Sequence, residues 1–277
     1  MTATEHSLAN LWKTRTYNLG RMDMADLIRA FVTYPTVHAY LLLALICLGV
    51  TVYLLPSASL LGLAIAVALA IAVYPMAWYL IHRFMLHGQH LYKSRWTAAV
   101  WKRIHFDHHQ DPHDLRVLFG ALYTTLPTIA IITITVGWLV AGPAGGAIAF
   151  ATGLLTTCFY EFAHCVQHLN TTPKTKYMQR VKRLHLAHHF HNEQGNFGIT
   201  NFIWDRMLGT YYAKAKNVDR SATVFNLGYT AEMAERYPWV QELSGGVRRD
   251  GGPRPSGDDR NAGGEIVADG GSATAGS

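Results

Sequence analysis

Four long apolar runs, separated by short breaks or by polar stretches, dominate the first two thirds of the chain. They are TVHAYLLLALICLGVTVYLL at 36–55, LLGLAIAVALAIAVYPMAWYLI at 60–81, a run at 117–141 that includes LPTIAIITITVGWLV, and a run at 144–165 that includes AIAFATGLLTTCFY. A helix that crosses a bilayer needs about 20 mostly apolar residues. Because only helices and closed barrels satisfy the backbone in lipid, the pattern predicts an all-α integral membrane protein with four transmembrane helices.

The connections between these runs predict two helical hairpins. Pro56 and the glycine-rich AGPAGG at 141–146 mark two tight turns, and Pro75 inside the second run is expected to kink its helix. Neither turn contains Lys or Arg, whereas basic residues fill the stretches 83–116 and 174–183. The positive-inside rule then places both termini and the middle segment in the cytoplasm.

Composition agrees with a membrane protein. Half of the residues are hydrophobic and 15% are charged, against roughly a quarter charged in soluble domains. The net charge of +6 follows from the cytoplasmic loops, so no nucleic-acid partner is expected. We predict a cytosolic or interfacial segment at 1–34, a membrane domain at 35–245, and a disordered glycine-rich tail at 246–277, where too little apolar surface is present to offset ordering.

Ten of the 15 histidines form four clusters, each at the predicted cytoplasmic end of a helix or in a cytoplasmic segment. The clusters are His82 and His87; His105, His108 and His109; His164 and His168; and His185, His188 and His189. All four can meet in one plane just outside the membrane. Ten imidazoles exceed what one tetrahedral site uses, so the pattern predicts two metal ions bound by these ten residues.

Helical spacing supports most of these clusters. Residues at i, i+3 and i+4 share one helix face, so each HxxHH triplet can point in one direction. His82 and His87 differ, because five residues separate them by about 140° on an ideal α-helix. They either bind different ions or require a local change at the helix end.

The ligand type also bears on the chemistry. Imidazole suits Zn, Cu, Fe and Ni, while soluble di-iron bundles use Glu and Glu-x-x-His ligands. Neutral imidazoles leave the ions most of their positive charge, which suits oxidation of an unactivated C–H bond in a lipid. Metal-bound histidines need partners for the second ring nitrogen. Glu161 is the first candidate because it is the only carboxylate in the fourth run, and Asp107 and Asn192 are weaker ones.

The four histidine boxes, HX4H, HX2HH, HX3H and HX2HH, make residues 75–212 similar to the fatty acid hydroxylase and sterol desaturase superfamily of membrane di-iron enzymes. The stretch HLAHHFHNEQGNFGITNFIWDRMLGTYY most resembles fatty acid 2-hydroxylases, through Phe197–Gly198, Trp204–Asp205 and Gly209–Thr210. The resemblance implies two iron ions, with zinc able to replace them in purified protein, and hydroxylation by O2 and two external electrons.

One departure concerns electron supply. Many eukaryotic fatty acid 2-hydroxylases carry a fused cytochrome b5 domain, whereas residues 1–34 are too short for one and lack its HPGG motif. A separate cytochrome b5-, ferredoxin- or rubredoxin-like donor is therefore expected. The glycines of GNFGITNFIWD are expected to permit close backbone approach. Phe197, Phe202 and Trp204 are candidates either for an acyl-channel wall or for interfacial anchors.

Three alternatives remain open at this point. A sterol or carotenoid hydroxylase, or a lipid desaturase, would use the same histidine boxes. A membrane metal transporter is the main non-enzyme alternative, although transporters place ion sites near the bilayer midplane. The expected location is a multi-pass position in a bacterial inner membrane or the endoplasmic reticulum.

Overall fold

Helices and turns make up the regular structure of residues 18–244, which are the part of the chain described by the computed structural model. No β-strand occurs within this range, so the all-α prediction is confirmed for it. The predicted disordered tail at 246–277 and the first 17 residues of the predicted N-terminal segment lie outside the described residues. Residues 18–34 form the short helix η1 (Leu19–Arg21) and α2 (Met24–Val32).

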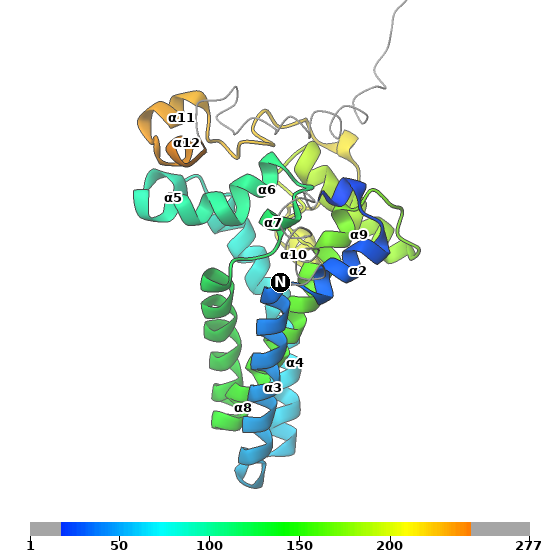
Figure 1. Ribbon diagram of the computed structural model, residues 1–277, viewed down its shortest axis with the longest axis vertical. Coiled ribbons are helices and arrows are strands. Elements are labelled where there is room, and N and C mark those ends of the chain that lie inside the picture. Colours follow the sequence, from blue (N-terminus) through cyan, green and yellow to red (C-terminus); the bar gives the residue numbers. More distant parts are fainter. Residues whose placement is uncertain (1–17, 245–277) are drawn as a thin grey trace, which may run out of the picture.

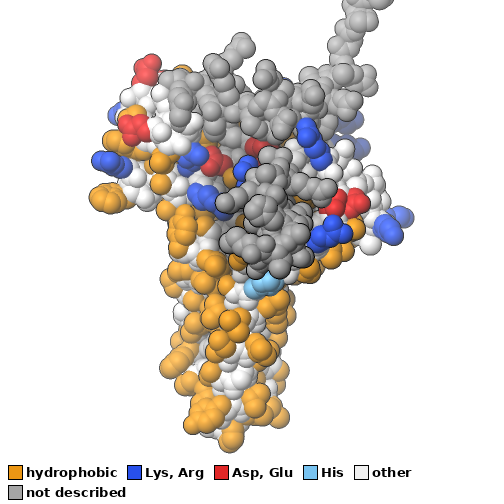
Figure 2. Space-filling view, in the orientation of Figure 1, with side chains coloured by type: hydrophobic (Ala, Val, Ile, Leu, Met, Phe, Trp, Pro, Cys, Tyr) orange, Lys and Arg blue, Asp and Glu red, His pale blue; other side chains and the backbone are white. Residues whose placement is uncertain are grey.

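Three long helices form an apolar stem below a more polar cap (Figures 1 and 2). They are α3 (Pro35–Leu54), α4 (Leu60–Leu80) and α8 (Leu122–His168). With their helical extensions, three segments are long and apolar enough to cross a membrane: Pro35–Ser57, Leu60–Leu86 and Leu115–His168. The stem exposes large apolar side chains that a soluble surface would avoid, such as Leu42 at 60% and Leu139 at 80%.

Helix α8 is interrupted at Ala141 and Gly142, where the backbone leaves the helical region. Gly142 has φ +60°, a conformation that favours glycine. The chain then folds back, and a Cβ on Gly137 of the first arm would lie 2.1 Å from the carbonyl oxygen of Gly145 on the second. The 54-residue apolar segment thus has two arms packed side by side, as the predicted second hairpin requires. The number of membrane crossings itself stays a prediction.

Small side chains bring the helices of the stem together. Ala66 and Ala70 of α4 pack against Ala149 in the second arm of α8. A hydrogen bond joins Tyr40 Oη in α3 to Thr125 Oγ1 in α8 over 2.6 Å. Close backbone approach and hydrogen bonds between helices are the main sources of association in lipid, so these contacts fix the positions from which the stem enters the cap.

Short helices make up the cap, and two π-helices continue stem and cap elements without a break. The π-helices are η3 (Ile81–Leu86) and η5 (Lys102–Phe106). The other cap elements are the 3-10 helices η4 (Leu91–Lys93) and η6 (Ala215–Asn217) and the α-helices α5 (Arg95–Trp101), α6 (Asp107–Gln110), α7 (Leu115–Leu118), α9 (Lys176–Phe190), α10 (Ile203–Met207), α11 (Ala231–Arg236) and α12 (Trp239–Ser244). One further 3-10 helix, η2 (Leu55–Ser57), lies at the far end of the stem. Helix α5 packs with α11 and α12 on one side of the cap, while α2 and α9 lie on the other (Figure 1).

The third apolar run becomes a long helix later than the sequence predicted. Residues around 117 belong to the short α7, and Phe119 and Ala121 are extended before α8 begins at Leu122. The N–H of Gly120 donates to Glu161 Oε1 over 3.2 Å. This contact to the second arm of α8 keeps residues 119–121 extended, so that α7 and α8 do not form one continuous helix.

The fold-back of α8 gives a matched test. Gly137→Ala places a Cβ 2.1 Å from the Gly145 carbonyl, so the arms must separate, and we expect a loss of about 1–3 kcal/mol in the free energy of unfolding. Gly49→Ala in α3 is the control, because a Cβ there meets nothing within 4 Å. Thermal unfolding in detergent, followed by fluorescence-detected gel filtration, measures both. Equal midpoints for the two variants would contradict the close packing of the arms.

Candidate metal centre

The ten clustered histidines reach one region of the cap from five elements. His82 lies in the π-helix η3, and the backbone N–H of His87 donates to the His82 carbonyl over 3.0 Å. This i→i+5 turn is wider than an α-helical turn, and it brings the two rings to a centroid separation of 4.9 Å. The five-residue spacing is therefore accommodated by a π-helix rather than by binding in different places.

The second π-helix, η5, has the same effect on the next histidine box. It carries His105 and ends at Phe106, so that α6 begins at Asp107 and carries His108 and His109. His164 and His168 occupy the last turns of α8, and α9 supplies His185, His188 and His189. Both π-helices thus lie directly at histidine ligand candidates, which is where such distortions are often found.

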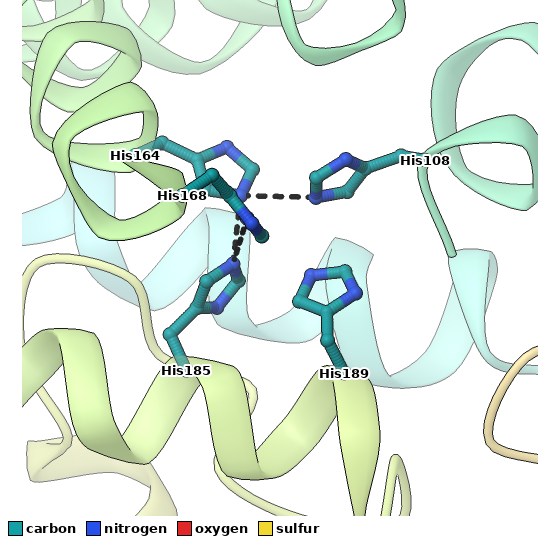
Figure 3. Close-up of side chains that lie close together, drawn as sticks. All are labelled: His108, His164, His168, His185 and His189. Atoms are coloured by element: carbon teal, nitrogen blue, oxygen red, sulfur yellow. Dashed lines mark hydrogen bonds between the residues drawn. The ribbon is translucent and has the colours of Figure 1, made fainter. Parts of the chain in front are cut away.

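The ring nitrogens gather into two groups. Donor atoms of His82, His87, His109 and His188 lie within 4.8 Å of one another, as do those of His108, His164, His168, His185 and His189. His105 joins the first group, since its Nε2 is 2.8 Å from His87 Nε2. Figure 3 shows the second group, with the Nε2 atoms of His164 and His168 each 2.9 Å from that of His185.

Each HxxHH box divides between the two groups. In the first box, His105 and His109 lie in one group and His108 in the other; in the second box, His188 lies apart from His185 and His189. Helical spacing allows each triplet to point in one direction, and the structure divides each triplet between two groups. The two groups adjoin, because the rings of His109 and His189 are 4.2 Å apart between centroids.

Burial keeps these rings uncharged. Eight of the ten histidines are buried, and His87 and His164 are partly so. Desolvation lowers the pKa of the seven that lie in the cap, His87, His105, His108, His109, His185, His188 and His189, and lowers that of His109 to about 3. Neutral imidazole is the form that binds metal, so the rings are in the right protonation state at neutral pH.

The residues fit a pair of ions. The Nε2 atoms of His109, His188 and His189 are buried with no hydrogen-bond partner among the described residues, which costs free energy unless something binds them. Neighbouring Nε2 atoms lie 2.8–3.2 Å apart, close to the ~3 Å expected between ligands with metal–nitrogen bonds of roughly 2.0–2.1 Å. Metal ions would satisfy these nitrogens.

Backbone carbonyls hold three rings of the first group. The Nδ1 atoms of His82, His109 and His188 lie 2.6, 2.9 and 2.8 Å from the carbonyl oxygens of Phe197, Val224 and Gly195. A carbonyl only accepts, so Nδ1 carries the proton and Nε2 is left free for a ligand bond. The pattern of side chains along the chain does not reveal these three carbonyls, although two of them belong to the GNFG turn.

That turn is fixed by Asp205. The backbone N–H groups of Phe197 and Gly198 donate to its carboxylate over 2.7 and 2.9 Å, and Thr210 Oγ1 donates over 2.9 Å. A Cβ on Gly198 would lie 2.0 Å from the Asn201 carbonyl oxygen, so close backbone approach requires glycine there. Asp205 therefore positions the Phe197 carbonyl that holds His82.

The three carboxylate and amide candidates have other partners. Asp107 forms an ion pair with Lys102 at 2.8 Å, and Asn192 donates to the Asp219 carbonyl. Glu161 accepts from Gly120, while its Oε2 has no partner among the described residues. None of the three hydrogen-bonds to one of the ten histidines within residues 18–244, and their roles around the metal stay predictions.

An apolar cavity of about 400 Å³ lies directly beneath the histidines. His82, His105, His108, His164, His185 and His189 form one end, and Tyr74, Trp78 and Tyr160 line the part inside the stem. Glu161 also lines it. We call this space the inner cavity. It is large enough for a small-molecule site, and an apolar group bound in it would lie against the ring nitrogens.

The aromatic residues proposed for the acyl channel lie elsewhere. Phe197 is buried against His82, His87 and His188, with ring centroids 5.2–5.6 Å apart. Phe202 packs in a separate cluster with Val181 and Leu184. Neither residue, nor Trp204, lines the inner cavity. Whether they line an acyl channel or act as interfacial anchors stays a prediction.

Comparison with known proteins gives consistent matches. Residues 67–210 match the family model for fatty acid hydroxylase. The chain is 31% identical over 149 residues to the dihydroceramide fatty acyl 2-hydroxylase FAH2 of Arabidopsis thaliana, covering 52% of this chain and 59% of that protein. It is 28% identical over 146 residues to the fatty acid 2-hydroxylase of Rattus norvegicus, covering 51% of this chain and 38% of that protein.

A solved structure shares the fold. The hydroxylase domain of full-length scs7p superimposes with a TM-score of 0.54 at 24% identity, over 73% of this chain and 71% of that one. The chain spans 59% and 38% of the length of the two relatives named above. These similarities establish a shared domain and its fold.

The buried neutral rings predict acid sensitivity. Folded histidines with pKa values below 6.5 stay unprotonated, whereas unfolded ones titrate near 6.5, so the stability they contribute is complete above pH 6.5 and is lost as the pH falls below it. We expect the thermal midpoint of chelator-treated protein to fall steeply between about pH 6.5 and 5. The thermal midpoint of metal-loaded protein should stay high down to a lower pH. A flat profile without metal would show that the rings are exposed to water.

Proposed function

The chain belongs to the fatty acid hydroxylase family, and from this premise we propose that it is a membrane-bound, O2-dependent lipid hydroxylase acting on an acyl chain. The observation that carries the proposal is the inner cavity, an apolar space inside the stem whose upper end consists of six of the ten histidines. A hydrocarbon chain in this cavity lies against the ring nitrogens. The curated relatives act as fatty acyl or fatty acid 2-hydroxylases, according to their names.

The proposed reaction balances as RH + O2 + 2 electrons + 2 H⁺ giving ROH + H2O. We propose that two iron ions are held by the ten histidines, one by each group, and that this pair supplies O2 activation when bound. The chain itself contributes the fixed tautomers of His82, His109 and His188. It also contributes the apolar walls of the inner cavity, which keep bulk water from the reacting carbon.

The topology is part of the same proposal. We propose four crossings, α3, α4 and the two arms of α8, with the cap on the cytosolic side. The break at Ala141–Gly142 and the contact between Gly137 and Gly145 support a return of the chain. The visible face of the cap carries Lys and Arg (Figure 2), and the sequence has neither residue in 35–82 or 122–168, which supports the orientation. Electrons then come from a separate cytosolic donor, and both termini face the cytosol.

The division of the histidine boxes gives a test of metal binding. Purified protein should bind about two Co²⁺ ions per chain in a titration followed by visible absorption, because each group offers a complete set of imidazoles. His188→Ala combined with His82→Ala removes two ligands of one group, and one ion should remain. His188→Ala combined with His164→Ala affects both groups, and both ions should weaken.

The control for these pairs is His90→Ala, since His90 is exposed and outside both groups. It should retain the full metal content. Equal stoichiometry in the two double variants would mean that the groups do not correspond to separate ions, even if the protein binds metal.

Lipid analysis tests the reaction itself. Cells that express the chain should accumulate a lipid heavier by one oxygen atom, labelled when the cells grow under ¹⁸O2. His188→Ala should abolish this product because it removes a ligand that the Gly195 carbonyl holds in place. A product lighter by two hydrogens would indicate a desaturase instead. Metal uptake with no change in lipids would favour a transporter and overturn the proposal.

A further inference from the structure

An open groove of about 650 Å³ lies on the outside of the stem, between α4 and the second arm of α8. Its part along the stem is lined by Ile71, Leu155 and Phe159, which are 53%, 45% and 57% exposed. Its end at the cap is lined by the more polar Tyr177, Thr200 and Asn201. We call it the lateral groove. The side chains become more polar in the direction of the cap.

The lateral groove and the inner cavity share two residues, Tyr74 and Tyr160, which line both spaces. Their rings meet edge to face with centroids 5.8 Å apart. Of the two spaces, Trp78 lines only the inner cavity, and its ring stacks on that of Tyr160 with centroids 5.9 Å apart. A wall of aromatic side chains therefore separates the outside of the stem from the space beneath the histidines.

The two tyrosines of this wall are held differently. Tyr74 is 3% exposed, and its hydroxyl donates to Thr157 Oγ1 over 2.9 Å. Tyr160 is only half-buried, has no hydrogen bond to another residue of the range 18–244, and is held by ring contacts with Tyr74, Trp78 and His164. A rotation of Tyr160 breaks no hydrogen bond within the described residues. Of the two tyrosines, Tyr160 is therefore the less firmly held.

Helix α4 is also weakened at the groove. Pro75 lines the groove and has no backbone N–H. In a regular helix that N–H would bond to the carbonyl of residue 71, and Ile71 lines the same groove. The missing bond therefore lies on the groove face, at the level of Tyr74, where it makes local adjustment of α4 less costly.

We propose that the lateral groove binds the acyl chain of a membrane lipid and admits it to the inner cavity past Tyr160. The occupant follows from three observations. The lining Ile71, Leu155 and Phe159 lie in the segments suited to cross a membrane, so hydrocarbon chains surround them. The polar end at Asn201 matches a lipid's polar end, and only the shared wall of Tyr74 and Tyr160 lies between the groove and the inner cavity. The inference deepens the proposed function and rests on it for the reaction that the acyl chain undergoes in the inner cavity.

Photolabelling tests the route without requiring turnover. The protein is placed in phosphatidylcholine vesicles in which a fraction of the acyl chains carries a diazirine, irradiated, digested and mapped by mass spectrometry. Leu118 and Thr157 line the inner cavity but not the lateral groove, and both are less than 9% exposed, so only a lipid chain inside the cavity labels them efficiently. Labelling of Leu42, exposed on α3, serves to normalise each sample.

Variants separate this route from others. Leu155→Trp and Thr156→Leu fill the groove from positions that do not line the inner cavity, and each should reduce inner-cavity labelling several-fold. Leu139→Trp is the matched control, because Leu139 is 80% exposed on the other arm of α8 and lines neither space. Inner-cavity residues of the Leu139→Trp variant should be labelled to the same extent as those of the native chain. Tyr160→Ala should increase inner labelling. Metal content and thermal midpoints verify that each variant is folded.

Two results would overturn the inference. One is inner-cavity labelling that is unchanged by both groove-filling variants; the other is an absence of inner labelling in the native chain. Either result leaves the proposed function standing if the ¹⁸O-labelled product forms. Conversely, groove-dependent labelling without any oxidised product would support the lipid route and count against the hydroxylase.

Discussion

The structure depends on one constraint, the burial of many neutral imidazoles whose ring nitrogens face one another. A buried nitrogen without a partner costs free energy, and such nitrogens include Nε2 of His109, His188 and His189. Within residues 18–244, neither Glu161 nor Asp107 hydrogen-bonds to these histidines; Glu161 accepts from Gly120 and Asp107 pairs with Lys102. Bound cations would satisfy these atoms. They would also join the ends of α4 and α8 to α6 and α9, so that the stem and the cap would be held together through the site.

The division of the histidine boxes strengthens this connection. If each triplet served one ion, the two sites would be separable units. Instead His108 joins the group of α8 and α9, while His188 joins the group of η3, η5 and α6. Each ion would therefore be held by elements that also hold the other. The π-helices contribute because their wider turns allow His82 and His87, five residues apart, to face one point.

The features that sequence could predict are those that depend on periodicity and composition. The runs at 36–55 and 60–81 match α3 and α4 closely, and the four histidine boxes come together in one region, as their positions along the chain suggested. Residue type alone does not encode a π-helix, so the face shared by His82 and His87 was left open. The carbonyls of Phe197 and Val224 are invisible to a search for side-chain ligands. The aromatic wall at Tyr74 and Tyr160 was missed because both look like ordinary residues of an apolar helix.

The position of Tyr160 also limits how the wall can open. It lies one turn before His164 on the second arm of α8, and His164 Nε2 is within 3.2 Å of both His108 Nε2 and His185 Nε2. Displacing that arm would move His164 away from its group. The end of α8 is further held where His113 Nδ1 lies 3.0 Å from the His168 carbonyl oxygen. Since the helix cannot shift without disturbing the site, the passage must come from rotation of the Tyr160 side chain or from bending of α4 at Pro75. A lipid chain can then enter while the histidine groups stay intact.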